Sequence, residues 1–280
     1  MKIFYSPECE QYWQEGHPEH PKRVKKTHEF LKDRFDFAKA EECGDDELLL
    51  AHSKELVNKV RHRDFFDSDT PSLHNIFKYA KLAAGGAVQA MNIALHNENA
   101  FSLLRPPGHH AGKNFLGGFC YFNSIAVAVK LALKSMDRIV IIDIDGHHGN
   151  GTQDIFLGDV GVLFVSLHQK NAFPMSGFAS EKNCLNYPLM PGTKPDVYLD
   201  ILDKALDNVA EFDPDIIAVS AGFDTYRLDP LLELELEKDT YFDIGRMIKH
   251  LEKPCFAALE GGYSNDLPGC IYEFLRGLGD

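Results

Sequence analysis

The stretch IVIIDIDGHHGN, residues 139–150, decides the fold because an apolar run passes directly into acids, histidines and glycines. Four apolar residues precede Asp143, and Asp145, His147 and His148 follow closely. A continuous apolar run is typical of a strand that is buried on both faces, as in a parallel sheet. Ligands of open parallel sheets bind beyond the carboxyl ends of the strands, which is where these polar residues are expected to lie.

The same pattern recurs along the chain, with helical patterns between the apolar runs. The runs are AFSLLRPPGHH (100–110), RIVIIDIDGHH (138–148), VLFVSLH (162–168), DIIAVSAGFD (215–224) and CFAALEGGY (255–263). Helical spacing covers 123–136, where Asn123 is a candidate N-cap, and 196–212. No repeat or linker divides the chain. The alternation predicts an α/β fold, a single three-layer α/β/α domain over residues 1–280 with a central, mostly parallel sheet.

Composition excludes several classes of protein. The 280 residues are 44% hydrophobic and 25% charged, as in soluble globular proteins, and no apolar run is long enough to span a membrane. A net charge of -13 argues against direct nucleic acid binding and mildly favours cationic substrates. The N-terminus lacks the apolar core of a secretory signal, and the six scattered cysteines are typical of reduced thiols. We therefore expect a cytoplasmic protein of undetermined oligomeric state.

Asp143, Asp145 and His147 have the spacing of a metal site. They will project from one side of the strand or gather at its tip. Carboxylate and imidazole groups suit Zn²⁺, with Fe²⁺ or Mn²⁺ as alternatives. Asp224 is the best further ligand, because a charge at the end of a buried strand needs a partner. Such a set leaves a position open for water, as in catalytic sites. The alternative is that the acids cap helices and the histidines bond locally.

Two other segments carry groups suited to catalysis. His109 and His110 follow a rigid Pro-Pro-Gly turn, which suits proton transfer near neutrality. Tyr263 follows two glycines that let the backbone pass close to a ligand, so its hydroxyl is a candidate donor to an oxyanion. A turn closed by an aromatic side chain is the structural alternative for Tyr263.

Together these motifs resemble the zinc-dependent histone deacetylase family, which has the arginase/deacetylase fold. The matching segments, in the family's order, are HPEHPKR (17–23), RPPGHHA (105–111), GGFCYFNS (117–124), DIDGHHGNGTQ (143–153), VSLH (165–168), AGFDTYRLDP (221–230) and LEGGY (259–263). They cover nearly the whole chain. The forms HHGNGTQ and LEGGY are similar to the class II branch of the family.

The resemblance implies an amide hydrolase that uses metal-activated water to release acetate from acyl-lysine. The implied zinc ligands are Asp145, His147 and Asp224. The implied catalytic residues are His110 as general base and acid, His109 as its electrostatic neighbour, and Tyr263 as the group that polarises the carbonyl. His148 is expected to be structural.

The resemblance also implies supporting sites. The substrate-binding residues are Gly118, Phe119, Phe173, Leu231, Gly261 and, at the rim, Asp69. Arg23 matches an arginine of an acetate-release channel. A structural K⁺ ion is implied beside Asp143, which also orients His109; its other ligands are the Ser166 hydroxyl and backbone carbonyls of Asp145, His147 and Leu167.

Departures from the family bear on basicity and substrate. Asn150 stands where one branch has aspartate, so we expect a less basic His110. Leu231 directly follows Asp229-Pro230, where polyamine deacetylases carry an acid. PECE (7–10) resembles a motif of that polyamine branch but lies too far from the segment that matches PKR. Acyl-lysine in proteins or peptides is therefore the expected substrate, with acetylated polyamine as the alternative.

Two rival classes stay open. An arginase-like hydrolase would hold paired Mn²⁺ and would need more aspartates at the site. A degenerate member of the family would only bind acylated or amine ligands.

Overall fold

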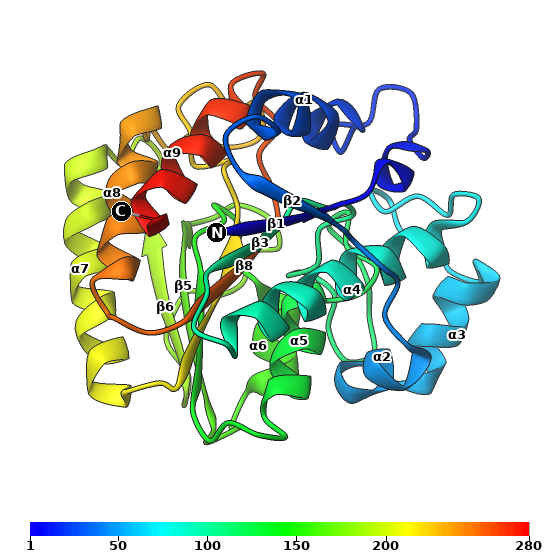
Figure 1. The fold of residues 1–280 in the computed structure, drawn as a ribbon, viewed down its shortest axis with the longest axis horizontal. Helices are drawn as coiled ribbons and strands as arrows, with labels where there is room; N and C mark the ends of the chain where they lie inside the picture. The colour runs from blue at the N-terminus through cyan, green and yellow to red at the C-terminus, as the bar shows by residue number, and fades with distance from the viewer. Residues whose placement is uncertain (280) are drawn as a thin grey trace.

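The computed structural model describes residues 1–279, and its centre is an eight-stranded sheet (Figure 1). The strand order is β2-β1-β3-β8-β7-β4-β5-β6, and every neighbouring pair is parallel. The strands are β1 (Lys2–Tyr5), β2 (Asp36–Lys39), β3 (Ala100–Ser102), β4 (Ile139–Asp143), β5 (Val162–Gln169), β6 (Cys184–Leu189), β7 (Ile216–Ala221) and β8 (Cys255–Leu259). The predicted α/β architecture is confirmed, and the sheet is parallel throughout rather than mostly parallel.

The five apolar runs of the sequence form β3, β4, β5, β7 and β8, and every residue of these strands is buried. The other three strands were not predicted. Residues of β2 are exposed or half-buried, and β6 contains Asn186 and Pro188. Outer strands such as these need no continuous apolar run, because neighbours do not cover them on all sides.

Helices cover both faces of the sheet (Figure 1). On one face α1 (Lys22–Leu31), α9 (Leu267–Gly279), α8 (Lys238–Lys249) and α7 (Pro195–Phe212) pack in succession. The other helices are α2 (Asp45–Ala51), α3 (Lys54–His62), α4 (Ile76–Ala94), α5 (Ser124–Ala132) and α6 (Asn150–Phe156), with a short 3₁₀ turn, η1 (Pro7–Glu10). Asn123 caps α5 as expected, because its side chain accepts a hydrogen bond from the Ala126 N–H.

The sheet order brings distant segments together. Strand β4 lies between β5 and β7, so Asp143 has Ser166 on one side and Ser220 on the other. Because all the strands are parallel, the segments that follow β4, β5, β7 and β8 meet at one edge. Within residues 1–279, no helix combines the length and apolar character needed to cross a membrane. The six cysteines are buried free thiols.

Candidate metal centre and active site

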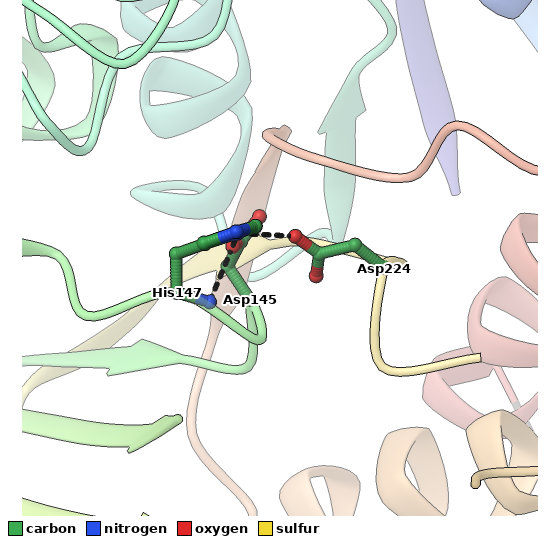
Figure 2. Close-up of side chains that lie close together, drawn as sticks. All are labelled: Asp145, His147 and Asp224. Carbon is green, nitrogen blue, oxygen red and sulfur yellow. Dashed lines mark hydrogen bonds and ion pairs between the residues drawn. The ribbon is translucent and has the colours of Figure 1, made fainter. Parts of the chain in front are cut away.

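Three potential metal ligands converge at the carboxyl edge of the sheet. Asp145 and His147 follow β4, and Asp224 follows β7 (Figure 2). His147 Nδ1 lies 2.7 Å from Asp224 Oδ2 and 3.2 Å from Asp145 Oδ1, and one ligand atom from each residue lies within 4.8 Å of the others. This is the one group of its kind found in the described part of the chain, residues 1–279. It fits a single ion better than a pair.

Backbone N–H groups fix the two carboxylates. Gly261 N donates to Asp145 Oδ2 over 2.7 Å, and Gly146 N donates to Asp224 Oδ1 over 2.7 Å. A Cβ atom at position 261 would lie 2.6 Å from Asp145 Oδ2 and 2.7 Å from Asp224 Oδ2. Only glycine therefore lets the backbone after β8 pass this close to both acids.

The two buried carboxylates in the group formed by Asp145, His147 and Asp224 favour binding of a cation. Burial and the charge of Asp145 raise the pKa of Asp224. Burial disfavours the charged form of His147, but Asp224 and Asp145 outweigh it and raise the pKa of the imidazole to about 10. Two fully buried carboxylates with one imidazole form an O,N,O donor set of a kind that Zn²⁺ accepts. The residues present therefore fit a divalent metal.

The alternative in which the acids cap a following helix does not describe the structure. Helix α6 is preceded by Gly149, which makes no side-chain cap. Asp143 instead bonds His109, and Asp145 accepts from Gly261.

His109 and His110 lie side by side with different partners. Their ring centroids are 4.0 Å apart; His109 Nδ1 lies 3.0 Å from Asp143 Oδ2, and His110 Nδ1 lies 2.8 Å from Asn150 Oδ1. Burial opposes the charged form of His109, but Asp145 and Asp143 raise its pKa well above the usual value. Burial, reinforced by the charge of His109, holds the pKa of His110 well below the usual value. His109 is therefore the charged member of the pair, and His110 is the neutral one.

One pocket of about 390 Å³ opens onto these groups. All the residues predicted to bind substrate line it, namely Asp69, Gly118, Phe119, Phe173, Leu231 and Gly261. Asp145, His147, His109, His110 and Tyr263 line it as well, whereas Asp224 does not. A Cβ atom at Gly118, whose φ is +56°, would lie 2.4 Å from the His110 ring and 2.8 Å from Phe173, so this wall requires glycine.

Tyr263 stands between this pocket and a second, smaller cavity of about 130 Å³ that Arg23 also lines. The Arg23 guanidinium lies 4.7 Å from the centre of the Tyr263 ring, and Arg23 Nε donates to the Gly262 carbonyl over 2.6 Å. Burial raises the pKa of Tyr263 well above its usual value, so its phenol stays protonated. Arg23 is absent from the lining of the main pocket, and its channel role stays a prediction.

The residues expected around K⁺ adjoin the metal group. Asp143 and Ser166 are register partners in β4 and β5, and Leu167 follows Ser166. His168 Nε2 lies 3.0 Å from the Gly177 carbonyl, so this nitrogen carries the hydrogen. His168 Nδ1 then accepts from the Ser166 hydroxyl over 2.9 Å, which leaves the Ser166 lone pairs free for a cation.

Sequence reasoning missed two supporting side chains. Asp229 accepts from Tyr263 N over 2.6 Å and from Leu231 N over 3.0 Å. Glu260 accepts from the turn that carries the two histidines. The sequence feature that could have indicated them is an acid close to a candidate site residue, since Glu260 precedes Gly261 and Asp229 lies two residues before Leu231. His148 bonds Ser176 and Gln153, as a structural residue would, in line with expectation.

Comparison with known proteins agrees with this geometry. Residues 17–277 match the histone deacetylase domain family. A probable deacetylase from Archaeoglobus fulgidus is 37% identical, over 89% of this chain and 77% of the relative. Acetylpolyamine amidohydrolase 1 from Pseudomonas aeruginosa is 37% identical, over 73% of this chain and 62% of the relative.

Among solved structures, the HDA15 HD domain superposes with a TM-score of 0.93 at 29% identity, covering 100% of this chain and 91% of the other. The family match spans strands β2 to β8, the three ligand-type residues and the residues that line the pocket. The chain therefore belongs to the histone deacetylase family.

Proposed function

We propose that this protein, a deacetylase by family, removes acetyl or other acyl groups from the ε-amine of lysine in proteins or peptides. The observation that carries the proposal is that one pocket joins apolar walls, including Phe119 and Phe173, to a floor with His110, Tyr263 and a metal-type group. The methylene chain of an acyl-lysine suits the walls, and its amide suits the floor. Hydrolysis adds water across the C–N bond and gives a carboxylate, acetate for an acetyl group, and the free amine.

Asp145, His147 and Asp224 would hold the catalytic ion, for which we propose Zn²⁺ with Fe²⁺ as an alternative. When bound, such an ion supplies Lewis acidity toward the amide carbonyl and lowers the pKa of water toward about 7. The buried aspartates hold the negative charge that binds the ion, and the Gly261 and Gly146 N–H groups fix their orientation.

His110 is the proposed general base and acid. Its Nδ1–H donates to Asn150 Oδ1, so Nε2 carries a lone pair that can accept the proton of the attacking water. The lowered pKa keeps this imidazole neutral near pH 7. His110 then returns the proton to the leaving amine. His109, charged and held by Asp143, stays protonated and limits the basicity of its neighbour.

Tyr263 is the proposed donor to the oxyanion that develops on the amide oxygen. Its raised pKa keeps the hydroxyl protonated, and Asp229 holds its backbone. A preorganised donor of this kind is worth roughly 10²–10³ in rate. We also propose that K⁺ binds at Asp143 and Ser166, with carbonyls of Asp145, His147 and Leu167, and that Arg23 lines a path for acetate through the smaller cavity.

Acetylated polyamine is the second candidate substrate, and a rim feature favours it. Asp69 lines the pocket mouth and lies beside Asp67, whose side chain accepts from Asp69 N over 3.2 Å. Burial and Asp67 raise the pKa of Asp69, so a cation bound at this rim would stabilise the ionised carboxylates. A distal ammonium of a polyamine would supply one. Leu231 in the wall offers no such charge and suits an acyl-lysine instead.

The test is a comparison of kcat/KM for acetyl-lysine peptides, longer acyl-lysines and acetylated polyamines with protein of known zinc content. We expect the peptides to give the highest value. A higher value for the polyamines would favour the second candidate. No hydrolysis of any of these by zinc-loaded protein would contradict the proposed activity and favour a degenerate, binding-only member of the family.

A further inference from the structure

Glu260 is a wholly buried carboxyl group that the proposed reaction does not use. It follows β8, and its backbone N–H donates to the Ala221 carbonyl over 2.9 Å, so the main chain there is fixed by β7. Its Oε2 accepts from Gly108 N over 2.6 Å and from His109 N over 3.1 Å. Its Oε1 has no hydrogen-bond partner among the described residues.

The two N–H groups belong to the turn that presents both histidines to the pocket. From the other side, the His109 carbonyl accepts from Gly151 N over 3.0 Å and from Thr152 N over 3.1 Å at the start of α6. Glu260 is the partner on the sheet side. Without it, two consecutive buried N–H groups would lose their acceptor, which is costly because buried backbone donors have no water to replace it.

The position of Glu260 in the chain gives these bonds a particular consequence. The next residue, Gly261, donates its N–H to Asp145 Oδ2 over 2.7 Å. Of these two successive residues, Glu260 bonds the turn that carries His109, and Gly261 bonds Asp145, which would bind the metal. The separation between the proton-transfer group and the metal-type group is therefore set by one short, rigid segment at the end of β8.

We propose that Glu260 is a positioning residue of this active site, which holds the turn carrying His109 and His110 by accepting the Gly108 and His109 N–H groups. The proposal rests on the deacetylase function above. What matters is the reach of the side chain to these N–H groups, and its charge is secondary. Glutamine has the same reach and an acceptor oxygen, whereas aspartate has the charge but is one methylene shorter.

The test compares Glu260→Gln, Glu260→Asp and Glu260→Ala as zinc-loaded proteins on the best acyl substrate of the wild type. We expect Glu260→Gln to stay within a few-fold of the wild type. Glu260→Asp and Glu260→Ala should lose roughly 10-fold to 100-fold in kcat with little change in KM, because a misplaced catalytic group costs rate at constant binding. Zinc content should be unchanged in all three.

Amide hydrogen exchange provides a readout that does not depend on activity. The amides of Gly108 and His109 should exchange faster in Glu260→Asp and Glu260→Ala and stay protected in Glu260→Gln. The matched control is Asp215→Ala, because Asp215 Oδ2 also accepts from two consecutive N–H groups, those of Asp137 and Arg138, at the opposite edge of the sheet. That variant should free these amides and leave kcat unchanged.

Two results would overturn the proposal. Activity retained in Glu260→Asp and lost in Glu260→Gln would show that charge matters and reach does not. Unchanged exchange at Gly108 and His109 in Glu260→Asp would show that the side chain is not their anchor, even if Glu260→Ala fails to fold. Should the wild type hydrolyse no substrate, the proposed function fails, and the exchange result still decides the role of Glu260.

Discussion

Acids gather at both edges of the central sheet, but they meet opposite surroundings. At the carboxyl edge, Asp145 and Asp224 are fully buried, and their charged neighbours are imidazoles: His147 Nδ1 lies 2.7 Å from Asp224 Oδ2, and His109 Nε2 lies 3.7 Å from Asp145 Oδ1. At the amino edge, Asp213 is exposed and bonded by Lys253 Nζ at 2.7 Å and Arg138 Nη2 at 2.9 Å.

The surroundings of these acids, and not their residue type, mark the functional site. The hydrogen bond from Lys253 lowers the pKa of Asp213. Burial and Asp145 raise the pKa of Asp224. Asp213 therefore stabilises the folded state above its unfolded pKa, and this stabilisation is lost as the pH falls through its folded pKa. The ionised carboxylate of metal-free Asp224 instead destabilises the folded state, and this destabilisation is relieved as the pH falls and the group is protonated. Full burial, with imidazoles rather than lysine or arginine as the ion-pair partners, distinguishes the site.

The largest effect is expected from Asp224→Asn, at the carboxyl edge. Removing one anionic ligand should abolish stoichiometric zinc binding and lower kcat/KM by about 10³-fold or more, because the ion supplies several kcal/mol to the reaction. Metal analysis and steady-state kinetics measure both effects. The metal-free variant should unfold at a temperature no lower than that of the metal-free wild type, because burial and Asp145 disfavour the charge of Asp224 even with His147 beside it.

Asp213→Asn is the matched change at the other edge. It should leave zinc content and kcat/KM unchanged and lower the unfolding temperature slightly, an effect that shrinks in high salt because exposed pairs are screened. Full zinc binding by Asp224→Asn, or a loss of zinc in Asp213→Asn, would contradict the distinction between the two edges.

Tyr263→Phe separates the metal group from the reaction that it supports. Zinc content should be preserved, while kcat falls by roughly 10²–10³-fold because a preorganised oxyanion donor is removed. Tyr187→Phe is the control, since the Tyr187 hydroxyl lies outside the pocket and accepts from Asn208. An unchanged kcat in Tyr263→Phe would remove this residue from the mechanism.

The smallest effect is expected from Asn150→Asp, which adds one acid at the carboxyl edge. A carboxylate at His110 Nδ1 would stabilise the imidazolium, so the pKa of His110 should rise from its lowered value. The base is active when neutral, so the acidic limb of kcat/KM should move to higher pH, by about one unit. The pH–rate profile measures this shift, and a limb that stays in place would show that Asn150 does not tune His110.

Much of the fold was readable from the sequence, and the reason is burial. The central strands are continuous apolar runs because neighbours and helices cover them. The end strands β2 and β6 carry no such signal, and the apolar run of the inner strand β1 is only three residues long. The six predicted substrate-binding residues line one pocket. Glu260 and Asp229 were missed as supports because their partners are backbone N–H groups, which no motif displays.

The types of groups at the carboxyl edge can be read from the amino-acid order alone, because polar residues directly follow buried parallel strands. The sequence also shows that position 150 holds asparagine and not an acid, and the structure adds that this asparagine bonds His110. Only the tertiary structure decided that β7 lies beside β4, which brings Asp224 to His147 from 77 residues away. The structure likewise decided which imidazole is charged, since the pKa depends on burial and on neighbours that the chain order does not reveal.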